Sequence, residues 1–136
     1  MSNSVLIIDD SQVIREKVIS ILESRKLFTR FHQAEDGLDG FKKLLVNPVD
    51  IILCDLEMPR RDGFKFLVML KNRPDLRDTP VIILTGNDDR ELKIKGLEQG
   101  ASDFITKPFD PEELIARMNV HLKIKKLQDE LKTSNE

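Results

Sequence analysis

Four short apolar runs in this sequence each end abruptly on a polar side chain. The runs are Val5-Leu6-Ile7-Ile8 before Asp9-Asp10, Ile51-Ile52-Leu53-Cys54 before Asp55, Val81-Ile82-Ile83-Leu84 before Thr85, and Phe104-Ile105-Thr106 before Lys107. Runs of this length suit strands that are covered on both faces, as in a parallel sheet. Because right-handed crossovers bring the carboxyl ends of parallel strands to one edge, we expect three carboxylates, a hydroxyl and an ammonium to meet there.

The stretches between these runs carry helix signals. Helices are expected after the cap Ser11 as far as about Arg25, after the cap Asp36 with Leu38, Phe41, Leu44 and Leu45, from Phe64 to Asn72, from Asp89 to Gln99 after a cap at Asn87-Asp88, and from Pro111 to Lys132 after the cap Asp110. Residues 28–34 read as a weaker strand near an edge, and the Pro and Asp-Gly signals of residues 58–63 predict a tight loop beside Asp55. This alternation predicts an α/β fold with helices covering a parallel sheet.

The expected helix from Asp89 to Gln99 has a thin apolar stripe. Only Leu92, Ile94 and Leu97 are apolar, and Gly96 lies inside the helix. An interior glycine and few apolar contacts weaken a helix. We therefore expect this helix to be the least firmly held, which suits a moving element.

The last expected helix is longer than a small domain needs. From Pro111 to Lys132 it would span roughly 33 Å at about 1.5 Å per residue. Beyond Met118, its apolar residues continue at coiled-coil spacing among charges. They are Val120, Ile124, Leu127 and Leu131. The distal half is expected to project, and a helix that folds back on its own domain is the alternative.

Composition narrows the classes of protein that the chain can be. Its 136 residues suit one domain, with 40% apolar residues to form a core. The 22 basic and 24 acidic side chains give a net charge of -2, without the basic footprint of a nucleic-acid binder. One cysteine excludes an intrachain disulfide, and no long apolar segment suggests a membrane span. We expect a cytoplasmic protein that contacts neither nucleic acid nor membrane directly.

The polar groups at the strand ends suggest phosphoryl chemistry. Asp9, Asp10 and Asp55 cannot all be ionised at close range without a counter-charge. So few protein oxygens suit Mg²⁺, which keeps several waters and accepts a phosphate oxygen as a further ligand. Lys107 offers an ammonium and Thr85 a hydroxyl to the same phosphate. An aspartate among these groups is a candidate nucleophile.

An ordered set of motifs carries a resemblance to a known family. The motifs are Asp9-Asp10, Asp55 with Met58-Pro59 and Asp62-Gly63, Thr85-Gly86, and Phe104 three residues before Lys107-Pro108-Phe109. From about Val5 to Leu122 the chain resembles the receiver domain of two-component response regulators. The resemblance implies a flavodoxin-like fold with a five-stranded parallel sheet in the order 2-1-3-4-5, and five helices. It divides the chain into a receiver domain, 1–122, and a helical extension or linker, 123–136.

The same resemblance assigns roles at the acidic edge. Asp55 is expected to take a phosphoryl group from a sensor histidine kinase or a histidine phosphotransfer protein. Asp10, Asp55 and the backbone carbonyl of Glu57 are expected to ligate Mg²⁺ directly, with Asp9 acting through water. Lys107 and Thr85 are the expected catalytic residues, and the Lys107-Pro108 bond is expected to be cis. Asp55 should also take a phosphoryl group from small phosphodonors, and it should lose this group by autodephosphorylation.

By resemblance, Thr85 and Phe104 form the switch that reads phosphorylation. Thr85 moves toward the phosphoryl group, and Phe104 rotates into the space that it vacates. Phe104 stands where the family often has tyrosine, so we expect looser coupling, while Glu57 and Asn87 tune the phosphoryl lifetime. The readout surface is the fourth helix, the fifth strand and the last helix. It is expected to control dimerisation or an output domain such as a diguanylate cyclase.

Two other functions stay open on the sequence. The first is a Mg²⁺-dependent phosphohydrolase with an aspartyl-phosphate intermediate. Such enzymes place a second Asp, which acts as acid and base, two positions after the nucleophile, whereas this chain has Glu57 there. The second is a receiver kept only for protein interactions, against which the intact acidic residues argue. Cys54 is interpreted as a buried apolar residue. His32 and His121 are interpreted as residues without partners.

Overall fold

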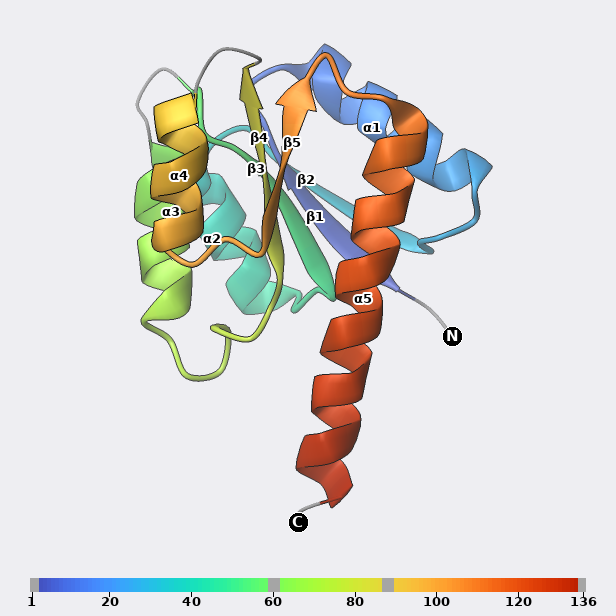
Figure 1. Ribbon diagram of the computed structural model, residues 1–136, viewed down its shortest axis with the longest axis vertical. Helices are drawn as coiled ribbons and strands as arrows, with labels where there is room; N and C mark the ends of the chain where they lie inside the picture. The colour runs from blue at the N-terminus through green and yellow to red at the C-terminus, as the bar shows by residue number, and fades with distance from the viewer. Residues whose placement is uncertain (1–2, 59–61, 87–89, 135–136) are drawn as a thin grey trace.

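The computed structural model describes residues 3–58, 62–86 and 90–134. Five parallel strands form one sheet in the order β2-β1-β3-β4-β5 (Figure 1). The strands are β1 (Ser4–Ile8), β2 (Arg30–Ala34), β3 (Ile51–Asp55), β4 (Val81–Gly86) and β5 (Asp103–Lys107). This confirms the predicted doubly wound, flavodoxin-like fold, with the weaker strand β2 at an edge.

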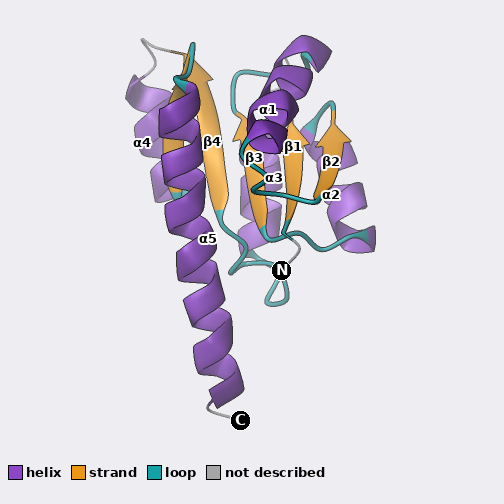
Figure 2. Cartoon of the chain, turned by 90° about the vertical axis from the view of Figure 1, so that its right-hand side faces the viewer, coloured by secondary structure: helices purple, strands orange, loops and turns teal. Residues whose placement is uncertain are grey.

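Helices cover both faces of the sheet (Figures 1 and 2). They are α1 (Gln12–Ser24), α2 (Gly37–Val46), α3 (Asp62–Lys71), α4 (Arg90–Glu98) and α5 (Pro111–Ser134). Alternate residues of the strands point into two separate cores, as the pleat of a strand requires. In β1, Leu6 and Ile8 join the core under α2 and α3, whereas Val5 and Ile7 join the core under α1 and α5.

The central strand β3 is buried along its whole length. Each of its large apolar side chains contributes roughly 1.5–3 kcal/mol when fully buried. A shift of register by one residue would move every side chain to the other face, so this burial fixes where the strand ends. Asp55 is therefore held at the carboxyl edge by the packing of the residues before it.

Side-chain caps fix where the helices beside that edge begin. The Ser11 hydroxyl accepts a hydrogen bond from the backbone N–H of Ile14, and the Asp36 carboxylate accepts one from Asp39. The Asp110 carboxylate likewise accepts a bond from the first turn of α5. These caps were predicted, and they satisfy backbone donors that a helix leaves unpaired. The predicted start of α4, at residues 87–89, and residues 59–61 of the predicted tight loop lie outside the described residues.

The apolar residues of α2 do not all face the core. Phe41 and Leu44 pack inward, but Leu38 and Leu45 are 59% and 48% exposed. Instead, Gly40 lies against Ile8 so closely that a Cβ atom would meet its side chain. The helix is rotated to let this glycine approach the sheet, which an apolar pattern alone does not reveal.

Helix α4 meets the sheet through a glycine as well. Gly96 is buried against Ile83 and Leu56, and Leu92 is half-buried. Ile94 and Leu97, which the sequence placed on the apolar stripe, are 46% and 39% exposed. The glycine therefore permits close packing in addition to weakening the helix.

Helix α5 has two halves with different surroundings. Leu114 and Met118 are fully buried, and Ile115 and Leu122 also pack against the sheet, as predicted. The second half extends beyond the domain (Figure 1), which confirms the extended last helix. Its outer residues Val120, Ile124, Leu127 and Leu131 are between 44% and 63% exposed. Within the described residues, no helix combines the length and apolarity that crossing a membrane requires.

Candidate functional site

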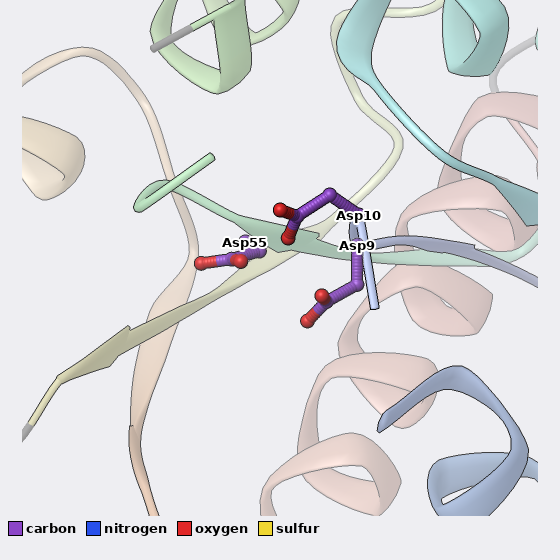
Figure 3. Close-up of side chains that lie close together, drawn as sticks. All are labelled: Asp9, Asp10 and Asp55. Carbon is purple, nitrogen blue, oxygen red and sulfur yellow. The ribbon is translucent and has the colours of Figure 1, made fainter. Parts of the chain in front are cut away.

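Three carboxylates gather at the carboxyl edge of the sheet (Figure 3). Asp9 and Asp10 follow β1, and Asp55 is the last residue of the neighbouring strand β3. One carboxylate oxygen from each lies within 4.8 Å of the others. Asp9 and Asp55 are buried, whereas Asp10 is exposed. The convergence predicted from the strand ends is confirmed for these residues.

Backbone amides orient two of these carboxylates. Asp55 Oδ1 accepts a hydrogen bond of 2.8 Å from the N–H of Glu57, and Asp9 Oδ1 accepts one of 2.9 Å from the N–H of Ser11. Both donors lie two residues after the acceptor, so the chain must turn directly after each strand. The remaining oxygen of each carboxylate is left for other partners.

Lys107, the last residue of β5, supplies that partner. Its ammonium lies 3.0 Å from Asp9 Oδ2 and 3.2 Å from Asp55 Oδ2. Burial lowers the pKa of Lys107, but Asp55 and Asp9 more than offset this effect, so its pKa is raised and the ammonium stays charged. The Lys107-Pro108 bond is cis, as predicted.

One ammonium does not balance the acidic cluster. Burial raises the pKa of Asp55; the Glu57 N–H and Lys107 act against this effect, and Asp10 adds to it. A raised pKa means that ionised Asp55 lacks sufficient positive charge nearby. Carboxylate oxygens at this spacing are the ligands that a hard divalent cation prefers. The residues present therefore fit Mg²⁺.

Thr85 brings an unpaired hydroxyl to the same edge. It lies in β4, one residue beyond the position that pairs with Asp55. The residue is fully buried, and its Oγ1 has no hydrogen-bond partner in the described part of the chain. A buried polar group without a partner costs roughly 1–3 kcal/mol. The site thus contains a donor that a phosphate oxygen could satisfy.

Glu57 and Gly86 meet at the mouth of the site. A Cβ atom on Gly86 would lie 2.7 Å from a carboxylate oxygen of Glu57. The Glu57 side chain therefore occupies the space that the missing side chain of Gly86 leaves. Any larger residue at position 86 would displace this exposed carboxylate.

The sequence does not mark Arg15 as part of the site, but its side chain bonds to the loop after β1. Its guanidinium donates hydrogen bonds to the backbone carbonyl of Asp9 and to the side chain of Gln33. It thereby ties α1 and β2 to one of the clustered aspartates. An arginine in the first turns of a helix carries no specific sequence signal for such a contact.

Phe104, in β5, is half-buried and packs against the core under α2 and α3. Two cations lie over its ring: the Lys93 ammonium is 5.2 Å from the ring centre and the Arg117 guanidinium 5.7 Å. Cations at this distance are attracted by the ring electrons. The sequence marks the ring as a switch residue but neither of the cations that hold it.

Asp103, next to Phe104, ties β5 to α5. Arg117 donates a hydrogen bond of 2.8 Å to Asp103 Oδ1, and His121 Nε2 lies 3.1 Å from Oδ2. The interpretation of His121 as a residue without a partner is therefore wrong. Its spacing from Arg117 by one helical turn was the available signal, because it places both side chains on one face of α5.

Cys54 has no role at the site. It is 1% exposed, and burial is the largest of the effects that raise the pKa of its thiol, followed by the nearby aspartates. A protonated, buried thiol is a poor nucleophile. This confirms the interpretation of Cys54 as a buried apolar residue.

Comparison with known proteins supports this geometry. The sequence of residues 5–119 matches the family model of the response regulator receiver domain. The phosphate regulon transcriptional regulatory protein PhoB of Escherichia coli K12 is 38% identical over 118 residues, covering 87% of this chain and 51% of PhoB. The response regulator PleD of Caulobacter vibrioides is 38% identical over 135 residues, covering 97% of this chain and 29% of PleD.

A solved structure gives the same result. It is described as a probable two-component system response regulator/GGDEF domain protein, and it aligns with a TM-score of 0.82 at 32% identity, covering 91% of this chain and 50% of that chain. The chain spans about half or less of the length of these relatives. The matched segment contains the strands, the clustered carboxylates, Thr85 and Lys107. The chain belongs to the family of response regulator receiver domains that act in two-component signal transduction.

Proposed function

We propose that this chain is a phosphoacceptor switch acting in the cytoplasm, in which Asp55 takes a phosphoryl group from a histidine kinase or a phosphotransfer protein. The observation that carries the proposal is the convergence of Asp9, Asp10 and Asp55 with Lys107 and the unpaired hydroxyl of Thr85. A carboxylate nucleophile needs neighbours that neutralise the incoming phosphate, and the edge of the sheet supplies them.

Mg²⁺ is the proposed cofactor. Asp10, Asp55 and the backbone carbonyl of Glu57 are its proposed direct ligands, with Asp9 acting through water. When bound, the ion neutralises charge on the transferring phosphoryl group. The three carboxylates and the raised pKa of Asp55 support this assignment.

The protein's own groups then complete the transfer. Asp55 Oδ attacks phosphorus while the bond to the donor's leaving group breaks, so the carboxylate becomes an acyl phosphate. The Lys107 ammonium, already 3.2 Å from Asp55, pairs with a phosphoryl oxygen. Thr85 donates its hydroxyl hydrogen to another oxygen, which gives this buried group the partner that it lacks.

The movement of Thr85 is proposed to reach Phe104. The two residues lie on the paired strands β4 and β5, with Phe104 opposite Ile83. As Thr85 turns toward the phosphate, the ring rotates inward and leaves the two cations that hold it. The change then reaches α4 and α5, because Lys93 belongs to one helix and Arg117 to the other.

The projecting half of α5 is the proposed output of the receiver domain 1–122. Residues 123–136 then form a helical extension that dimerises through its exposed apolar residues or leads to a further domain. The α4-β5-α5 surface is a second possible dimer contact, and the relative with a GGDEF domain makes a diguanylate cyclase one candidate output. Sedimentation of the wild type and of Leu127→Glu/Leu131→Glu, each with and without phosphorylation, tests the helix. A monomer throughout contradicts dimerisation by this helix.

Intact mass after incubation with a small acyl-phosphate donor and Mg²⁺ tests the central proposal. One phosphoryl group should be gained, and it should be absent in Asp55→Asn and in the metal-free control. A gain that persists in Asp55→Asn would overturn the assignment of the nucleophile. The phosphohydrolase alternative gains no support from the matched family, and rapid multiple-turnover consumption of the donor would be needed to revive it.

A further inference from the structure

A small hollow lies at the opposite edge of the sheet from the acidic cluster. Its volume is about 160 Å³, and most of its lining is polar. Pro80 and Ser102 lie just before β4 and β5, so they mark the amino-terminal edge. The projecting half of α5 forms the other wall through residues that include His121 and Gln128. The hollow therefore joins the folded domain to its helical extension.

Two cations line this hollow, Lys71 at the end of α3 and Arg77 in the following segment, and both share one nearby acid, Asp78, with cations of α5. The Lys71 ammonium donates one hydrogen bond, of 2.9 Å, to the backbone carbonyl of Arg77. Burial lowers the pKa of Lys71, and the nearby Asp78 carboxylate offsets only part of this effect. The Arg77 guanidinium makes no ion pair among the described residues.

The other charges of the lining are already balanced. Asp78 pairs with Lys132 of α5, and Lys125 pairs with Asp129 at 2.6 Å. With these two pairs counted as neutral, an excess of two positive charges remains around the hollow, although Asp78 also attracts Lys71 and Arg77. Helix α3 ends at Lys71, and the partial negative charge of its last carbonyl groups offsets only part of this excess.

Neutral donors complete the lining. The Ser102 hydroxyl oxygen accepts a hydrogen bond from the N–H of Val81, so its own hydrogen is available to a ligand. The Gln128 side chain adds an amide. A guanidinium, an ammonium and a hydroxyl around a small volume match the oxygens of a tetrahedral oxyanion.

We propose that this hollow binds a small dianionic oxyanion of the phosphate or sulfate type, which bridges Lys71 and Arg77 to the extension of α5. The excess of two positive charges matches a dianion, and because Arg77 is exposed, solvent and salt screen its charge and the binding should be weak. A bound anion reinforces the link that Asp78 and Lys132 already make between the same two segments. If the extension carries the output, as proposed above, the anion is a second input that stiffens it.

A titration with inorganic phosphate followed by backbone amide NMR tests the site. The full chain is used in the Asp55→Asn background with a chelator, at constant ionic strength set by chloride, so that the acidic cluster does not contribute. Saturable shifts are expected near Lys71, Arg77, Ser102 and Gln128. Shifts that never saturate, or that centre on Thr85 and Lys107, overturn the proposal.

Variants test which residues bind phosphate, and other anions test the specificity of the site. Arg77→Gln, an exposed substitution, should weaken phosphate binding at least fivefold, and Lys71→Met, which keeps the side-chain stem, should do the same. The matched control is Arg73→Gln, because Arg73 is in the same segment but pairs with Asp75 outside the hollow. Sulfate should compete and acetate should not. Unchanged affinity in Arg77→Gln, or equal binding of acetate, contradicts the proposed site whatever the phosphorylation assay of Asp55 shows.

Discussion

The Lys93 ammonium lies 5.2 Å from the centre of the Phe104 ring. Arg117 lies over the same ring, so cations from α4 and α5 both hold it in its observed position. No hydroxyl is available on this ring to form a hydrogen bond with either helix. Its position in the unphosphorylated protein therefore depends on packing and on these two charges.

Removing one of these cations should favour the inward position of the ring. A cation over an aromatic ring at a partly exposed site contributes about 0.5–1 kcal/mol, so Lys93→Met should shift the equilibrium by roughly two- to fivefold. NMR signals of the Phe104 ring should move part of the way toward their values in the phosphorylated protein. Lys95→Met is the matched control, because Lys95 lies over Phe64 instead. Identical Phe104 signals in both variants would argue against the clamp.

Lys107→Met should change Mg²⁺ binding and phosphorylation in opposite directions. The variant removes a cation that competes for Asp9 and Asp55, so Mg²⁺ should bind roughly fivefold more tightly, about 1 kcal/mol for one unit charge at this range. Phosphorylation should be roughly 100-fold slower, because a charge that stabilises the transferring group is lost. Calorimetric titration is suitable because the chain has no Trp or Tyr to report by fluorescence. The matched control is Lys107→Arg, which keeps the positive charge. Weaker Mg²⁺ binding by Lys107→Met than by the wild type would contradict this account.

Thr85→Val should stabilise the unphosphorylated protein while disabling the switch. The substitution removes a buried hydroxyl that has no partner among the described residues and keeps its volume. The free energy of unfolding should rise by about 1 kcal/mol, or roughly 4 °C in Tm. The response of Phe104 to phosphorylation should be lost. Thr85→Ser, which retains a hydroxyl, should keep that response, and a Thr85→Val protein that is less stable than wild type would show that the hydroxyl has a partner at rest.

The acidic edge could be predicted from the sequence because each of the four apolar runs is recognisable and leads into a polar residue. Four apolar runs fixed the strands, and the topology of parallel sheets then brought Asp9, Asp55 and Lys107 together. Local rules also located the caps Ser11 and Asp36, since a cap involves only residues within one turn. These features depend on short stretches of chain.

Contacts that depend on how a helix is rotated could not be predicted in this way. Leu38 and Ile94 are exposed because the close approach of a glycine decides which face of each helix meets the sheet. The bonds from Arg117 and His121 to Asp103 join two elements, and their formation depends on the position of α5 relative to β5. Periodicity gives the spacing of such residues along a helix but not the partner that they meet.

Asp103 should make part of the stability of the domain depend on pH. Burial raises the pKa of Asp103, but the N–H of Phe104, Arg117 and His121 together lower it, and the net shift is downward from 3.8. Its contribution is therefore present above that value and is lost as the pH falls through the lowered pKa. Asp103→Asn should cost about 1 kcal/mol at pH 7, a modest value because Arg117 is partly exposed, and the difference should fade below pH 3.8.

Urea unfolding of the wild type and Asp103→Asn at a series of pH values measures this dependence. The control is Asp129→Asn on the exposed part of α5, where the pair with Lys125 spans one turn and is worth roughly 0.3–0.5 kcal/mol. If Asp103→Asn and Asp129→Asn lose the same small amount at pH 7, the bonds to Arg117 and His121 do not hold α5 on β5. A difference between wild type and Asp103→Asn that grows as the pH falls would reverse the sign of the argument, because an acid with a lowered pKa stabilises the folded state only while it is ionised.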